Sequence, residues 1–159
     1  LTPIEVVEVL AKRKCDAVAG RNSDAFVLAA DTIVVHNDAI LGKPDSTEHA
    51  IETLKALSNI THEVITGVAY QWRDQGVEGS FSVLSRVTFH ELSDELIQRY
   101  VATGEPLDKA GAYGIQGLGA ALVKRVEGSY WNVVGLPLSE VVEVLIKELG
   151  DQILLSKSP

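Results

Sequence analysis

An aspartate inside an apolar run is the first residue whose surroundings indicate chemistry. Asp31 interrupts the nearly continuous apolar stretch 25–35. A carboxylate in such a place costs free energy unless it is paired, hydrogen-bonded or bound to a metal ion. Acids held in this way are typical of functional sites, where they serve as general bases. The alternative is that Asp31 lies at the solvated end of a strand and caps a turn.

Two lysines also occupy unusual positions. Lys14 falls on the apolar stripe of a predicted helix, where its ammonium group must reach a partner, a cavity or the solvent. The apolar positions at helical spacing around it are Val7, Leu10, Ala17 and Val18. Lys43 lies between a glycine and a proline, so a rigid loop presents it. Both ammonium groups could neutralise phosphate oxygens.

The glycine-rich stretch 105–119 adds further acids and a flexible backbone. Its glycines are Gly111, Gly114, Gly117 and Gly119. Glycine lets the backbone approach a ligand closely and turn its N–H groups toward anionic oxygen. Because Pro106 also interrupts the stretch, we predict a loop instead of a long helix or a central strand. A glycine-rich turn that binds no ligand is the alternative.

This set of residues suits the hydrolysis of a phosphate ester or anhydride. Lysines neutralise phosphate oxygens, carboxylates hold a divalent cation or deprotonate water, and glycines expose backbone donors. The candidate metal ligands are Asp31, Glu105 and Asp108. The residues do not by themselves identify the bond that is cleaved.

Composition and spacing exclude several other classes. A net charge of −8 argues against a general nucleic-acid or membrane surface, and no apolar run approaches the ~20 residues that span a bilayer. The single cysteine, Cys15, excludes an internal disulfide, fits a reducing compartment and is predicted to be buried. The histidines lack the paired spacing of a zinc site and are predicted at the surface or at strand edges. Tyr130 and Trp131 are predicted as core residues more readily than as a stacking platform for a base.

The elements that position these residues alternate between helix and strand. Capping residues and prolines predict helices over 3–19, 47–57, 94–102 and 137–149. Apolar patterns predict strands over 25–35, 39–41, 61–72, 80–90 and 120–126, with 61–72 and 80–90 forming an antiparallel hairpin. The fold class is α/β: a mixed, curved sheet flanked by helices, with a substrate cleft. We predict a single domain over 1–150 and a C-terminal tail over 151–159.

Three separated groups of motifs resemble the Maf-like nucleoside triphosphate pyrophosphatases. They are Ala-Asp-Thr at 30–32 with Leu-Gly-Lys-Pro at 41–44, the segment 108–117, and the segment 128–138. The resemblance runs from the first helix to about Leu149. It implies a Maf/ITPase-like fold and hydrolysis of a nucleoside triphosphate between its α and β phosphates with Mg²⁺ or Mn²⁺. It also implies a cytoplasmic role in removing non-standard nucleotides.

The resemblance further implies roles for individual residues. The aspartate of the Ala-Asp-Thr motif is the family's proton acceptor, which here is Asp31. The adjacent Thr32 and the loop residue Gln116 match positions that set base preference, and this pair resembles the subgroup that acts on dTTP and UTP. The family's lysines correspond to Lys14 and Lys43. A glutamine amide offers both a donor and an acceptor, which suits the edge of a uracil or thymine ring. Gln116 could instead hydrogen-bond within its own loop.

One departure from the family pattern leaves alternative functions open. The sequence has no methionine and no Ser-Pro-Arg-Arg segment, so we expect an N-terminal strand and helix to be missing and the natural gene product to be longer. The alternatives are a catalytically weak nucleotide-binding or cell-division regulatory protein, and a 7-methyl-GTP pyrophosphatase. A nucleoside triphosphate is the expected partner, and a homodimer fits a domain of this size.

Overall fold

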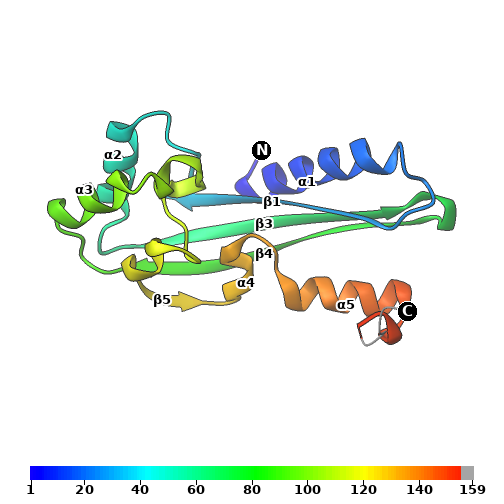
Figure 1. The fold of residues 1–159 in the computed structure, drawn as a ribbon. Helices are drawn as coiled ribbons and strands as arrows, with labels where there is room; N and C mark the ends of the chain where they lie inside the picture. The colour runs from blue at the N-terminus through cyan, green and yellow to red at the C-terminus, as the bar shows by residue number, and fades with distance from the viewer. Residues whose placement is uncertain (155–159) are drawn as a thin grey trace.

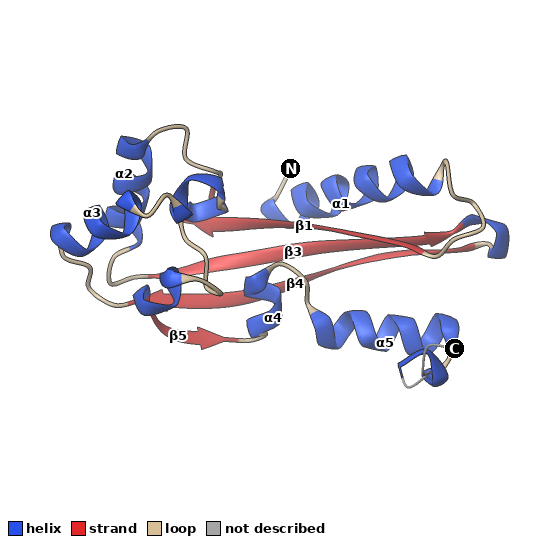
Figure 2. Ribbon diagram, viewed as in Figure 1, coloured by secondary structure: helices blue, strands red, loops and turns tan. Residues whose placement is uncertain are grey.

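The structure, a computed structural model, describes residues 1–154 and consists of a five-stranded antiparallel sheet with helices on both faces (Figures 1 and 2). The strand order is β2-β1-β3-β4-β5. The strands are β1 (Val27–His36), β2 (Ala39–Leu41), β3 (Thr61–Trp72), β4 (Val77–Phe89) and β5 (Val123–Glu127). The helices are α1 (Pro3–Ala19), α2 (Thr47–Leu57), α3 (Asp94–Ala102), α4 (Tyr130–Val134) and α5 (Leu138–Leu149). The predicted α/β class, with helices flanking a sheet, is confirmed.

The predicted antiparallel hairpin of β3 and β4 is confirmed, and it lies at the centre of the sheet. β1 pairs with β3 from Val27 opposite Gln71 to Val35 opposite Glu63. β2 covers only the last three residues of β1, so no described strand pairs with the outer side of residues 27–33. The first two-thirds of β1 is therefore an edge of the sheet, and this edge borders the candidate site.

Helix α1 covers one face of the sheet and begins with the predicted capping box. The Thr2 hydroxyl accepts from the Glu5 N–H, and the Glu5 carboxylate accepts from the Thr2 N–H. The helix ends at Ala19, before Gly20, as predicted. It lies along β1 and β3 in Figure 1.

The predicted apolar stripe of α1 is wrong in most of its positions. The buried residues recur every four positions, at Val7, Ala11, Cys15 and Ala19. Only Val7 was predicted correctly: Leu10 is half-buried and Ala17 and Val18 are exposed. Small residues along the stripe let the helix approach the sheet closely, and larger side chains fall beside the contact line. Lys14 consequently lies at the margin of the buried face, and the predicted burial of Cys15 is confirmed.

The larger core lies on the opposite face of the sheet. It combines β3 and β4 with α2, α3 and the glycine-rich segment. Its fully buried side chains include Leu54, Leu57, Ile97, Phe89 and Leu122. Ser46 and Ser93 cap α2 and α3 as predicted. Because α2 precedes β3 and α3 follows β4, both helices stand at the end of the sheet where β5 lies (Figure 1).

The glycine-rich segment forms successive 3₁₀ turns, Glu105–Asp108, Ala110–Ala112 and Leu118–Leu122, in place of a helix or a strand. The last turn delays β5, which begins at Val123 and not at the predicted residue 120. Tyr130 and Trp131 were predicted in the core but are 41% and 48% exposed, because the short helix α4 buries Asn132 instead. No helix among the described residues is long and apolar enough to cross a membrane. Of the predicted tail, residues 155–159 lie outside the described part of the chain.

The contact between α1 and β3 predicts a strong effect at Gly67. A methyl group there would lie 2.5 Å from the backbone carbon and oxygen of Val7, so helix and strand would have to separate. We expect Gly67→Ala to lower the free energy of unfolding by about 2–3 kcal/mol, as overpacking does. Urea denaturation measures the change. Gly42→Ala is the matched control, since the added methyl group meets no atom within 4 Å. Equal stability of the two variants would contradict the close contact.

Candidate active site

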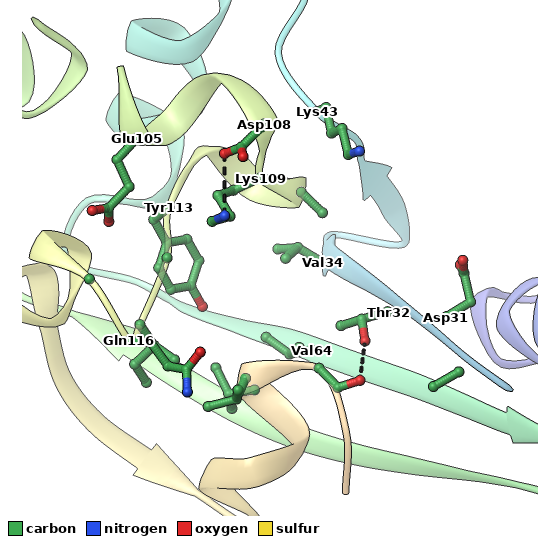
Figure 3. A pocket seen from close by; sticks show the side chains of 18 of the residues that line it. Asp31, Thr32, Val34, Lys43, Val64, Glu105, Asp108, Lys109, Tyr113 and Gln116 are labelled. Atoms are coloured by element: carbon green, nitrogen blue, oxygen red, sulfur yellow. Dashed lines mark hydrogen bonds and ion pairs between the residues drawn. The ribbon is translucent and has the colours of Figure 1, made fainter. Parts of the chain in front are cut away.

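A cavity of about 670 Å³ at the edge of β1 gathers every residue that the sequence predicted for the site (Figure 3). Its walls come from α1, β1, the loop after β2, the glycine-rich segment and the turn that follows α4. The predicted residues that line it are Lys14, Asp31, Thr32, Lys43, Glu105, Asp108 and Gln116. In Figure 3, Asp31 and Gln116 stand at opposite ends of the cavity. An elongated ligand could therefore contact both residues at once.

Neighbouring residues of β1 reach this cavity from opposite faces of the sheet. Asp31 lies opposite Gly67, on the face covered by α1, whereas Thr32 lies opposite Thr66, on the other face. The cavity reaches both side chains because it runs along the unpaired edge of β1. An interior strand would have separated the two side chains by the thickness of the sheet.

Asp31 forms an ion pair with Lys14. The Lys14 ammonium group donates to Asp31 Oδ1 and, at 3.2 Å, to the carbonyl oxygen of Ala30. The Asp31 side chain is only 17% exposed and sits in the middle of the strand, so it does not cap a turn at the strand's end. Its Oδ2 accepts no hydrogen bond from any residue in 1–154. The carboxylate is therefore held by one oxygen and has the other available to accept a proton.

Thr32 begins a chain of hydroxyl groups that leads into the protein. Its Oγ1 lies 2.8 Å from Thr66 Oγ1 and 3.3 Å from the carbonyl oxygen of Gly135, and Thr66 donates to the carbonyl oxygen of Asn132 at 3.2 Å. Since the Thr66 proton goes to Asn132, Thr32 is the donor to Thr66 or to Gly135. In either case the Thr32 oxygen presents its lone pairs as acceptors toward the cavity.

Asn132 holds α4 against the sheet, a role that sequence reasoning missed. It is fully buried, and its Nδ2 donates to the Val64 carbonyl oxygen at 3.1 Å and to Ser85 Oγ at 3.0 Å. These bonds fix the turn that carries Gly135 beside Thr32. The only sequence signal was an asparagine three residues after Ser129, which caps α4.

Two more lysines line the cavity, one from the loop after β2 and one from the glycine-rich segment. Lys43 forms no ion pair with any residue in the described range, so its ammonium group is open to a ligand. Lys109, which the sequence reasoning did not select, also lines the cavity and pairs with Asp108 at 3.3 Å. Its position next to a predicted site acid was the signal that could have identified it. With Lys14, the cavity therefore presents lysines from three separate segments.

A buried histidine supports the floor of the cavity. Tyr113, a lining residue, hydrogen-bonds His62 Nε2 through its hydroxyl at 2.8 Å, and both rings contact Phe89 edge to face. Burial raises the pKa of Tyr113, so the phenol keeps its proton. The prediction of surface or strand-edge histidines is wrong for His62, because its side of β3 faces the larger core.

Burial, assisted by the nearby His36, lowers the pKa of His62 from 6.5 to about 4. Between pH 6.5 and pH 4 the imidazole of His62 binds a proton in the unfolded chain but not in the folded one. The free energy of unfolding therefore decreases as the pH falls from about 6.5 to 4. We expect this loss to approach roughly 3 kcal/mol. Urea denaturation against pH, comparing wild type with His62→Gln, isolates it because the glutamine amide can still bond Tyr113. The variant should lose less stability on acidification, whereas the control His90→Gln, an exposed position, should follow wild type. Parallel curves for wild type and His62→Gln would contradict the buried neutral imidazole.

The acids of the cavity can supply a metal ion with only part of its ligands. Among residues 1–154, no three His, Cys, Asp or Glu side chains gather at metal-binding distance. Mg²⁺ characteristically binds one or two carboxylates and completes its coordination with water and substrate phosphates. The donor set therefore fits a hard divalent cation that arrives with a phosphorylated ligand.

Comparison with known proteins agrees with the motifs and the fold. The family model described as Maf-like protein matches residues 1–148. The dTTP/UTP pyrophosphatase of Moorella thermoacetica is 54% identical over 145 residues, which cover 91% of this chain and 75% of the relative. The proteins of the same name from Halalkalibacterium halodurans and Bacillus cereus AH820 are 53% and 51% identical, and the matches cover 73% and 74% of their lengths. This chain belongs to the Maf family.

Proposed function

We propose that the protein hydrolyses dTTP, UTP and related or modified pyrimidine triphosphates to the nucleoside monophosphate and pyrophosphate. The observation that carries the proposal is the single cavity that holds an ion-paired aspartate, three lysines and the Gln116 amide. The names of the relatives at 51–54% identity support the same reaction. The rest of the chemistry follows from where each group lies.

The lysines bind the triphosphate. Lys43 forms no ion pair with the described residues, and the only acid among them that pairs with Lys109 is the exposed Asp108, so either lysine can form ion pairs with phosphate oxygens. Lys14 stands beside Asp31 and can contact both the carboxylate and a phosphate. Positive charge fixed around the phosphates stabilises the negative charge that shifts onto the leaving pyrophosphate in the transition state.

Asp31 acts as the general base. Lys14 orients the carboxylate through Oδ1, and Oδ2 takes a proton from the attacking water as the new P–O bond forms. Water attacks the α phosphorus, the bond from this phosphorus to the oxygen that bridges it to the β phosphorus breaks, and the electron pair of that bond leaves with the pyrophosphate. The position of Asp31 at the sheet edge, with its side chain largely buried, limits the number of competing water molecules.

A divalent cation, Mg²⁺ or Mn²⁺, is the proposed cofactor, and Asp31, Asp108 and Glu105 are the candidate acids of the cavity that would contact it. When bound, such a cation supplies Lewis-acid polarisation of the phosphate oxygens. Three hydrogen bonds from the protein already reach the Glu105 carboxylate, which leaves it less free than the other two.

Gln116 and Thr32 are the proposed readers of the base. The Gln116 amide forms no hydrogen bond with the described residues, so the alternative in which it only stabilises its own loop finds no support in the structure. Its NH₂ and C=O can pair with adjacent acceptor and donor groups of uracil or thymine. The Thr32 oxygen adds an acceptor that lines the same cavity from β1.

The proposal extends to the cellular setting and the assembly of the protein. A single reduced cysteine and a nucleotide substrate point to the cytoplasm, and domain size alone suggests a homodimer. The net charge of −8 gives no reason to add nucleic acid or membrane as a partner.

A pyrophosphate-release assay tests the proposal. The protein is incubated with Mg²⁺ or Mn²⁺ and each of UTP, dTTP, CTP, ATP, GTP and 7-methyl-GTP. Preferential turnover of UTP and dTTP supports the proposed reaction. Preferential turnover of 7-methyl-GTP would show that the protein is a 7-methyl-GTP pyrophosphatase instead. Nucleotide binding without turnover would favour the alternative of a catalytically weak nucleotide-binding protein. Chelation of the cation should abolish turnover, and turnover that survives chelation would remove the cofactor from the proposal.

A further inference from the structure

We propose that Glu105 is a positioning residue for base selection, because its carboxylate fixes the backbone on the C-terminal side of Gln116 while its partner Tyr100 fixes the N-terminal side. This inference rests on the proposed function, since it explains how the pyrimidine reader is held. It also gives Glu105 a role other than metal ligation. We refer to Tyr100, Glu105 and the three amides that they bind, those of Gly114, Leu118 and Gly119, as the loop clamp.

The loop clamp is a closed set of hydrogen bonds around one carboxylate. Glu105 Oε1 accepts from the Tyr100 hydroxyl at 2.6 Å and from the Gly119 N–H at 3.0 Å. Its Oε2 accepts from the Leu118 N–H at 3.0 Å. The Tyr100 oxygen accepts in turn from the Gly114 N–H at 3.0 Å. Backbone amides two residues before and two residues after Gln116 are therefore bound to the same pair of side chains.

The glycines of the segment are explained by the space that this clamp occupies. A Cβ atom at Gly117 would overlap the Glu105 carboxylate. A Cβ atom at Gly119 would lie 2.5 Å from the Gly114 carbonyl oxygen and 2.6 Å from the Tyr100 hydroxyl. Glycine at these positions thus lets the backbone close around the acid, a steric role distinct from exposing N–H groups to a ligand.

The charge state of Glu105 fits this role. Desolvation alone would raise the pKa of Glu105, but the hydrogen bonds from Tyr100, Gly119 and Leu118 outweigh it and hold the pKa below its usual range. The clamp therefore contains an ionised carboxylate, and hydrogen bonds to an ionised acceptor are stronger than those between neutral groups. Burial, together with the bond to Glu105, raises the pKa of Tyr100, which keeps the tyrosine a donor.

The consequence for Gln116 follows from its own lack of partners. Its side chain is exposed and bonds no described residue, so only the backbone sets where the amide lies in the absence of a nucleotide. Ile115, which precedes it, is buried in the larger core and anchors the same stretch. Weakening the loop clamp should let the Gln116 amide occupy several positions. The difference in binding free energy between matching and mismatched bases should then become smaller.

The test compares Glu105→Gln with Tyr100→Phe and with the control Glu91→Gln, an exposed acid outside the cavity. Steady-state kinetics with UTP and with CTP gives the ratio of kcat/KM values, and a Mg²⁺ titration gives the cation requirement. Hydrogen exchange reports protection of the Gly114, Leu118 and Gly119 amides. We expect Glu105→Gln to reduce the UTP-to-CTP ratio at least tenfold, mainly through KM for UTP, to speed exchange at Leu118 and Gly119, and to leave the Mg²⁺ midpoint unchanged. Tyr100→Phe should change the ratio in the same direction and expose Gly114.

Several results would overturn the inference. An equal loss of kcat on both substrates with an unchanged ratio would show that the clamp does not serve base selection. A shifted midpoint of the Mg²⁺ titration in Glu105→Gln, with unchanged protection of the backbone amides, would show that Glu105 contacts the cation instead of positioning the loop. If the wild-type protein hydrolyses no triphosphate, the proposed function fails, but calorimetry with UMP and CMP still tests the loop clamp. A preference for binding UMP that Glu105→Gln removes would support the role of the clamp in base selection. Equal binding of the two nucleotides, or no binding, would overturn it.

Discussion

Replacing Asp31 with asparagine is expected to lower kcat for UTP hydrolysis by roughly 10²- to 10⁴-fold, the range typical of a lost general base. Asparagine has the same shape, and its Oδ1 can still accept from Lys14, so the positions of both side chains should persist. What disappears is the second carboxylate oxygen, which becomes an NH₂ group that cannot take a proton from water. The measurement is pyrophosphate release at saturating UTP, because KM should change much less than kcat.

The control for this variant separates catalysis from folding. Asp74→Asn makes the same substitution in the exposed β3–β4 turn and should leave both activity and stability unchanged. Urea denaturation should show Asp31→Asn to be folded, with a modest loss because its ion pair is partly exposed on the lysine side. A folded Asp31→Asn variant that retains more than about a tenth of the wild-type rate would remove Asp31 from the role of base.

Asp31 shows most clearly why residues of the candidate site could be predicted from the sequence. A charged residue within an apolar strand is costly wherever the strand packs, so the local sequence alone indicated a partner, and Lys14 is that partner. The sheet alternation, however, places Asp31 and Thr32 on opposite faces, and local patterns do not reveal which strand lies at an edge. The cavity reaches both residues because β2 pairs with only the last three residues of β1, and no other described strand pairs with the outer side of β1.

The residues that sequence reasoning missed act through contacts between distant segments. Asn132 bonds β3 and β4 from a helix more than forty residues further along the chain, and His62 pairs with Tyr113 across a similar separation. The stripe of α1 was predicted wrongly for a related reason. Its small residues Ala11, Cys15 and Ala19 pack against Val27 and Ala69 of the sheet, a close contact that the periodicity of large apolar residues does not reveal. Capping and turn residues, which act locally, were predicted correctly at Thr2, Ser46 and Ser93.

The substitution Gln116→Glu is expected to lower kcat/KM for UTP and dTTP by roughly 10²-fold, about 3 kcal/mol of transition-state binding. Glutamate accepts hydrogen bonds but donates none, so a uracil carbonyl oxygen that met the amide NH₂ would instead face a carboxylate. The new negative charge also lies in a cavity that binds polyphosphate, although the three lysines partly offset it.

The change in selectivity is the sharper part of this prediction. Cytosine carries an amino group where uracil carries a carbonyl, so a carboxylate at residue 116 can accept from it, and the loss on CTP should be much smaller than the loss on UTP. The ratio of kcat/KM for UTP to that for CTP should therefore fall at least tenfold, and stability should be unaffected, because the exposed Gln116 side chain contacts no core residue through a hydrogen bond in the described structure. Gln75→Glu, at an exposed position in the distant β3–β4 turn, adds the same charge without touching the cavity and serves as the control. Equal losses on every triphosphate would mean that charge repulsion alone explains the effect, and Gln116 would then have no part in reading the base.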